Sequence, residues 1–147
     1  MFPLVSLSFL VLTSIFVLAG GDLPSVPLAD QVFDSYGDIS WEEERVHLDN
    51  FAIELQRDPD AIGYIIAYAG RRACQREAQA RATRARAYVI NTRGIPKNRV
   101  KWIDGGYREK FTIVLQPVSR DVPAPIASPT VKRNEVRITK PCKPRGS

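Results

Sequence analysis

Arginine is concentrated in one stretch of the chain. Residues 71 to 86 contain six arginines and one glutamate, whereas residues 41 to 60 contain seven acidic and two basic side chains. Arg71, Arg72 and Arg76 lie near the N-terminus of a predicted helix, where guanidinium groups and free backbone N–H groups together suit a carboxylate or a phosphate. Two interpretations stay open: an anion-binding site, or two helices whose opposite charges hold them side by side.

The remaining reactive residue types give no sign of catalysis. His47 is the single histidine, and its acidic surroundings indicate a solvated helical residue rather than a catalytic base. The sequence has no Ser-His-Asp set, no metal-ligand cluster at a usable spacing and no phosphate-binding glycine loop. We therefore expect a protein that is not an enzyme and that uses no cofactor or metal.

The arginines lie between a predicted strand and a predicted helix. Residues 63–69 form a short apolar run rich in β-branched and aromatic residues, which is typical of a buried strand. Residues 76–93 have the period of a helix and end at Gly94. The apolar stripe of this helix consists of Ala78, Ala82, Ala85 and Val89. Because small residues let a helix lie close to a sheet, we expect this stripe to pack on the preceding strand.

A strand and a helix are also predicted before this unit. Residues 31–39 are predicted as the first strand, with a turn at Gly37-Asp38. Ser40 and Glu43 form a capping box for the helix that follows. The apolar face of that helix consists of Leu48, Phe51, Ala52 and Leu55.

Two further strands complete the predicted fold. Residues 99–103 are the first of them, broken at Gly105-Gly106, and residues 111–118 are the second. Pro117 indicates that this last strand lies at a sheet edge or ends there. The order is βαβαββ, which predicts an α/β fold of the α+β sandwich type, with a mixed sheet and two helices packed on one side.

Spaced motifs at and after the end of the second helix suggest a family. They are Tyr88-Val89, Gly94-Ile95, Arg99-Val100 and Gly106 to Glu109. This pattern resembles the "YL...GI...RI...G.GE" pattern of the OmpA C-terminal-like domain family, of which the chain looks like a divergent member. The resemblance covers residues 32–118.

The resemblance also implies a ligand site. Members of that family hold the diaminopimelate of the peptidoglycan stem peptide between an aspartate and an arginine. The aspartate position falls on Gly70, which has no carboxylate, and the arginine position falls on either Arg81 or Arg84. Arg71 and Arg72 are further candidates for ligand binding. Loss of one charge-assisted contact weakens binding by about tenfold to a hundredfold.

Two functions follow from the resemblance and stay open. The first is non-covalent binding of peptidoglycan by an exported cell-envelope protein. The second is a degenerate member that keeps the fold and acts as a protein-interaction or structural module, with another envelope protein as its partner. We expect no nucleic acid partner.

The two ends of the chain differ from its centre. Residues 1–20 have no charged side chain and end in small residues, which predicts a cleaved secretory signal, with an uncleaved membrane anchor as the alternative. Residues 21–31 form a spacer. Residues 119–147 form a Pro-rich basic tail, predicted to be extended or disordered, in which residues 134–139 have the alternation of a short strand.

Cysteine usage agrees with export. Cys74 and Cys142 are the only two cysteines, and in an exported protein we expect them to form one disulfide. The predicted location is the periplasm, the outer membrane or the cell wall, with membrane contact only through an uncleaved residue 1–20 segment.

Overall fold

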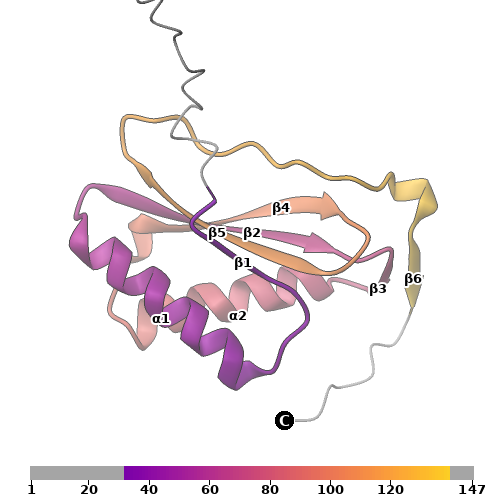
Figure 1. Ribbon diagram of the computed structural model, residues 1–147, viewed down its shortest axis with the longest axis horizontal. Helices are drawn as coiled ribbons and strands as arrows, with labels where there is room; N and C mark the ends of the chain where they lie inside the picture. Colours follow the sequence, from indigo (N-terminus) through magenta and orange to yellow (C-terminus); the bar gives the residue numbers. More distant parts are fainter. Residues whose placement is uncertain (1–31, 140–147) are drawn as a thin grey trace, which may run out of the picture.

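The computed structural model describes residues 32–139. Its elements are β1 (Asp34–Tyr36), α1 (Trp41–Arg57), β2 (Ala61–Ala69), β3 (Arg72–Cys74), α2 (Glu77–Asn91), the 3-10 turn η2 (Lys97–Arg99), β4 (Val100–Tyr107), β5 (Thr112–Ser119), the 3-10 turn η3 (Arg133–Glu135) and β6 (Arg137–Thr139). The predicted fold class is confirmed, because α1 and α2 lie on one side of a mixed four-stranded sheet (Figure 1). The predicted signal and spacer lie outside the described residues.

The strand order of the main sheet is β1-β5-β2-β4. β4 is parallel to β2, and β5 is antiparallel to both of its neighbours. Of the two interpretations of Pro117, an edge position is therefore wrong, since β5 is internal, whereas the strand does end soon after the proline, at Ser119. The proline is accommodated because β1 pairs only with residues 113–115 of β5, so that Pro117 lies beyond the paired part.

β4 continues past the point where the sequence predicted its end. Ala67 pairs with Asp104 and Tyr68 pairs with Gly106, so Gly105 is an extra residue in a β-bulge. A Cβ atom on Gly105 would lie 2.6 Å from the Tyr68 ring, and Gly106 has a φ of +79°. These glycines thus allow a bulge that packs on Tyr68, and they do not end the strand.

Helix α1 begins as predicted, and both helices pack largely as predicted. The capping box is present, with the Ser40 hydroxyl accepting from the Glu43 N–H and the Glu43 carboxylate accepting from the Ser40 N–H. The predicted apolar face of α1 is buried, and so are Ala82, Ala85 and Val89 of α2, which packs on β2 and β4. The first strand is shorter than predicted.

The start of α2 differs from the prediction. Arg76 is the residue before the helix and has a left-handed φ of 59°, with no side-chain cap. The preceding segment, for which no strand was predicted, contains the short strand β3, which pairs in parallel with β6. The predicted strand within residues 134–139 is thereby confirmed.

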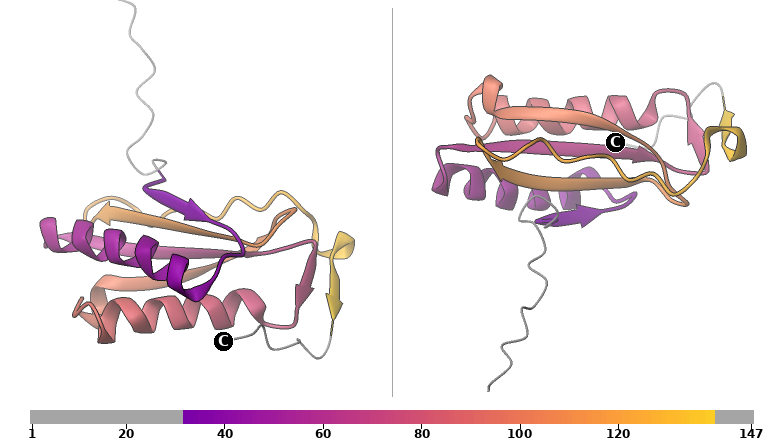
Figure 2. Two further views of the ribbon diagram at one scale, coloured as in Figure 1. Left: turned by 60° about the horizontal axis from the view of Figure 1, so that its bottom comes forward. Right: turned by 90° about the horizontal axis from the view of Figure 1, so that it is seen from above.

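A long extended segment, residues 120–139, crosses the sheet face opposite the helices (Figure 2); we call it the strap. Beneath it lies a small buried cluster of Ile66, Tyr68 and Val114. The Tyr68 hydroxyl accepts from the Ser128 N–H at 3.1 Å. Val131 is buried and forms a bridge with Tyr107 at the end of β4. The strap therefore serves as the second layer on this face.

Candidate functional site

A groove of about 570 Å³ lies where β2 ends, beside the β1–α1 loop and the β4–β5 turn. Its lining carries both signs of charge. The charged residues are Asp38, Glu77 and Glu109, which are acidic, and Arg71, Arg72 and Lys110, which are basic. A groove with both signs suits a ligand that itself carries an ammonium and a carboxylate.

Gly70 lines this groove and is buried. A Cβ atom on this residue would lie 3.1 Å from the backbone nitrogen of Phe111 and 3.4 Å from the carbonyl oxygen of Arg72. Both neighbours are backbone atoms, which move only with the β4–β5 turn and β3. An aspartate at this position would therefore displace the chain around it.

Arg71 and Arg72 both line the groove but have different surroundings. Arg71 donates two hydrogen bonds to the Glu109 carboxylate, at 2.9 and 2.6 Å, and lies 3.7 Å from Glu135 of the strap. The bonds from Arg71 lower the pKa of Glu109. Arg72 is exposed, and within residues 32–139 its side chain has no hydrogen-bond or ion-pair partner. Arg72 is thus the more available cation.

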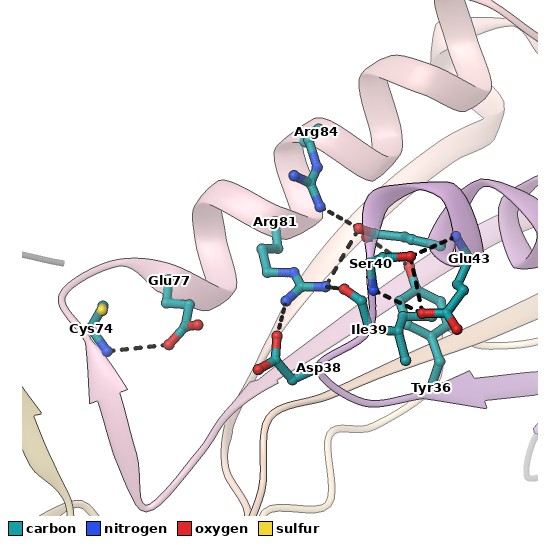
Figure 3. Close-up of polar contacts among 10 residues, drawn as sticks. Tyr36, Asp38, Ile39, Ser40, Glu43, Cys74, Glu77, Arg81 and Arg84 are labelled. Carbon is teal, nitrogen blue, oxygen red and sulfur yellow. Dashed lines mark hydrogen bonds and ion pairs between the residues drawn. The ribbon is translucent and has the colours of Figure 1, made fainter. Parts of the chain in front are cut away.

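Arg81 lies beside the groove and is only 11% exposed. It donates to the Asp38 carboxylate at 2.7 Å and to the Ile39 carbonyl at 3.4 Å (Figure 3). Its guanidinium also lies 4.4 Å from the centre of the Phe111 ring. These contacts hold Asp38 toward the groove, while the side chain of Asp38 remains 44% exposed.

Arg84 lies away from the groove and contacts α1 instead. It pairs with Glu44, whose side chain is fully buried, and its guanidinium lies over the Trp41 ring at 4.4 Å. Glu44 also accepts from the Tyr36 hydroxyl at 3.1 Å, and burial together with this carboxylate raises the pKa of Tyr36. Of the two interpretations of the arginines, the one in which opposite charges hold the two helices side by side accounts for the contacts of Arg84.

His47 is not the solvated residue that the sequence suggested. Its Nδ1 atom lies 2.6 Å from the Asp34 carboxylate, and its ring stacks on Tyr36 at 4.9 Å. The reason is that β1 lies beside α1, an arrangement that helical periodicity does not reveal. Within the described residues, no three His, Cys, Asp or Glu side chains gather as a metal site.

Sequence analysis missed Asp38 as a site residue. The sequence placed Asp38 only in a turn. The signal that could have identified it was its position two residues before Ser40, the N-cap of α1.

Cys74 ends β3 and has no disulfide within the described residues. Its predicted partner, Cys142, lies outside them. No helix in residues 32–139 is both long and apolar enough to span a membrane.

The groove therefore combines an exposed acid held by Arg81, an exposed arginine and a buried glycine. Of the arginines named as candidates, Arg71 and Arg72 line it, Arg81 lies at its edge and Arg84 lies between the helices. No protein-family model matches this chain, and neither the curated proteins nor the solved structures contain a match to it.

Proposed function

We propose that this chain is an exported, non-enzymatic cell-envelope protein whose groove binds the zwitterionic end of a peptidoglycan stem peptide. The observation that carries the proposal is the exposed carboxylate of Asp38 in the groove that contains Gly70. At Gly70, this chain lacks the aspartate of the family pattern. Asp38 supplies an acid to the same groove from the neighbouring β1–α1 loop.

The ammonium and the carboxylate of the ligand each contact groove side chains of opposite charge. Asp38 accepts from the ligand ammonium, and Arg81 acts as a positioning residue because it already donates to Asp38. Arg72 and Lys110 are exposed cations of the lining and bind the ligand carboxylate. Arg72 is preferred, since a planar guanidinium can donate two parallel hydrogen bonds to one carboxylate.

Export is part of the proposal and is supported by composition. The uncharged apolar residues 1–20 have the character of a secretory signal. The first strand of the described residues, β1, follows them in the chain. We propose that the groove is in the periplasm or at the outer membrane or cell wall, where peptidoglycan is available.

The experiment is cosedimentation of the purified chain with diaminopimelate-type peptidoglycan, with lysine-type peptidoglycan as the ligand control. Lysine-type stem peptides lack the second carboxylate, so we expect at least tenfold weaker binding to them. Asp38→Asn and Arg72→Gln are each expected to weaken binding to the diaminopimelate type by about tenfold to a hundredfold. Both residues are exposed, so circular dichroism should show a folded domain.

Matched controls lie at the opposite end of the sheet. Asp60 and Arg120 are exposed and adjoin Ala61 and Ser119, which pair with each other. Asp60→Asn and Arg120→Gln change the net charge as the test variants do, and we expect them to leave binding unchanged. Equal losses in test and control variants would mean nonspecific charge attraction and would contradict the proposed site.

The second candidate function is a protein-interaction or structural module of the envelope. The specific observation in its favour is that Arg81 and Arg84, the arginines that the family pattern selects, are already bound by acidic residues of the β1–α1 loop and α1. Absence of binding to either type of peptidoglycan by the folded chain would favour this candidate over the first.

A further inference from the structure

Two arginines lie side by side on the small sheet that β3 and β6 form. Arg72 of β3 and Arg137 of β6 are partners in the register of this parallel ladder. Partner residues on paired strands have their side chains on the same face of the sheet, and the strands are about 4.8 Å apart. The two guanidinium groups can therefore reach a single ligand atom group in front of the ladder.

Neither of these arginines is neutralised by the residues around it. Both are exposed, and within residues 32–139 neither side chain has a hydrogen-bond or ion-pair partner. Glu109 and Glu135 both pair with Arg71 instead. Glu77 accepts from a backbone N–H at the end of β3.

Such a pair of charges has a cost in the free chain. Like charges on directly opposite residues destabilise a sheet. An anion bound between the two guanidinium groups would remove this repulsion, because each group could then donate to the anion. The register of β3 and β6 therefore indicates an anion-binding site.

We infer that Arg72 and Arg137 together form one carboxylate site, in which both guanidinium groups bind the ligand carboxylate. The inference rests on the proposed function, in which Arg72 of the groove lining binds that carboxylate. A carboxylate has two oxygens and about four acceptor positions, so it can accept from two guanidinium groups at once. The structure adds Arg137, which makes the end of the strap part of the ligand site.

Backbone contacts hold β6 beside β3 without the Arg137 side chain. The Arg137 N–H donates to the Arg71 carbonyl at 2.9 Å, and the Gln75 N–H donates to the Thr139 carbonyl at 3.3 Å. Substitution of the Arg137 side chain should therefore leave the register intact. All three residues of β6 are exposed, and a two-stranded sheet of this length is marginal by itself. A carboxylate bound to both strands would thus hold the end of the strap against local opening.

The first test uses the full chain without ligand. Arg72→Gln removes one of the two like charges, so we expect hydrogen exchange of the Arg137 amide to slow by about twofold to fivefold. Lys132→Gln is the control, because Lys132 is an exposed strap residue whose side chain also has no partner within residues 32–139. It should leave the rate unchanged. If Arg72→Gln does not slow this amide, the two charges do not lie together and the inference is overturned.

The second test measures binding of a soluble stem peptide that contains diaminopimelate. We expect Arg137→Gln to weaken binding by about tenfold to a hundredfold. Arg137→Lys should recover only part of the loss, because an ammonium lacks the paired donors of a guanidinium. Lys132→Gln should bind as the unmodified chain does. The double variant Arg72→Gln/Arg137→Gln should lose less than the product of the two single losses, because both groups bind one carboxylate.

The outcomes of this test separate the inference from the proposed function. Absence of binding by the unmodified chain would refute the proposed function and the ligand assigned to the two arginines. Binding by the unmodified chain that Arg137→Gln leaves unchanged would overturn the inference alone. Losses that multiply in the double variant would mean two independent contacts in place of one site, which also overturns it.

Hydrogen exchange with bound stem peptide checks the link between the two strands. We expect exchange of the Arg137 amide to slow by about tenfold or more, because the ligand joins β6 to β3. The Val122 amide, which donates to the Ser119 carbonyl at the start of the strap, should not change. In Arg137→Gln, the peptide should leave the rate at residue 137 nearly unchanged. Equal slowing in this variant would mean that the side chain does not bind the ligand and would contradict the inference.

Discussion

The two faces of the four-stranded sheet are covered in different ways. On one face, two amphipathic helices bury large apolar side chains, including Leu48, Phe51 and Leu55 of α1. On the other face, the strap covers a small cluster built on Ile66, Tyr68 and Val114. Hydrophobic area therefore stabilises the first face, whereas a few directed hydrogen bonds hold the second.

This difference follows from chain composition. The helices have apolar residues at helical spacing, and each turn adds buried area. The strap has prolines and few large apolar residues, so it contributes one buried valine, Val131, and polar anchors at Ser128. The strap buries little surface, yet it is held in place because the sheet supplies Tyr68 and Tyr107 as partners.

The largest expected effect is on the helix face. Leu48 is fully buried, so Leu48→Ala is expected to lower the free energy of unfolding by about 2 to 5 kcal/mol, through lost transfer free energy and a cavity. Urea denaturation measures this loss. The matched control is Val46→Ala on the same helix, where the side chain is 59% exposed and a change within about 0.5 kcal/mol is expected. Similar losses at both positions would contradict the assignment of the buried face.

A smaller effect is expected on the strap face. Tyr68→Phe removes the hydroxyl that accepts from the Ser128 N–H, and we expect a loss of about 0.5 to 1.5 kcal/mol with faster hydrogen exchange at Ser128. Tyr88→Phe is the control, because the Tyr88 hydroxyl donates to Asp49 between the helices. That variant should leave the Ser128 exchange rate unchanged. If Tyr68→Phe leaves this rate unchanged as well, Tyr68 does not anchor the strap.

The smallest effect concerns the pH dependence of the ion pair that joins β3 to the β4–β5 turn. The hydrogen bonds from Arg71 lower the pKa of Glu109 below its ordinary value of 4.5. Because the pKa is lower in the folded than in the unfolded chain, the contribution of this pair is complete above the unfolded pKa. It is lost as the pH falls through the folded pKa.

A carboxyl titration followed by NMR measures this shift. Arg71→Gln should return the pKa of Glu109 toward its ordinary value, since the hydrogen bonds from Arg71 are the largest cause of the shift. Arg72→Gln removes the same charge from the next residue and should leave the titration of Glu109 nearly unchanged. An equal shift in both variants would mean that general charge, and not the hydrogen bonds, lowers the pKa.

Local features were predictable from the sequence alone. The capping box at Ser40, the apolar face of α1, the alanine stripe of α2 and the glycine end of that helix all depend on residues within a few positions of one another. Helical periodicity and capping chemistry are short-range effects, so a single sequence contains them. The fold class followed from the order of these elements.

Only the tertiary structure decided which distant segments meet. It placed β5 inside the sheet, paired β3 with β6 and laid the strap on the open face. In the tertiary structure, Asp38 also pairs with Arg81 at the groove, whereas Arg84 pairs with Glu44. Strand pairing and ion pairing join residues that are tens of positions apart. Their outcome depends on the packing of the whole chain, which local residue patterns do not encode.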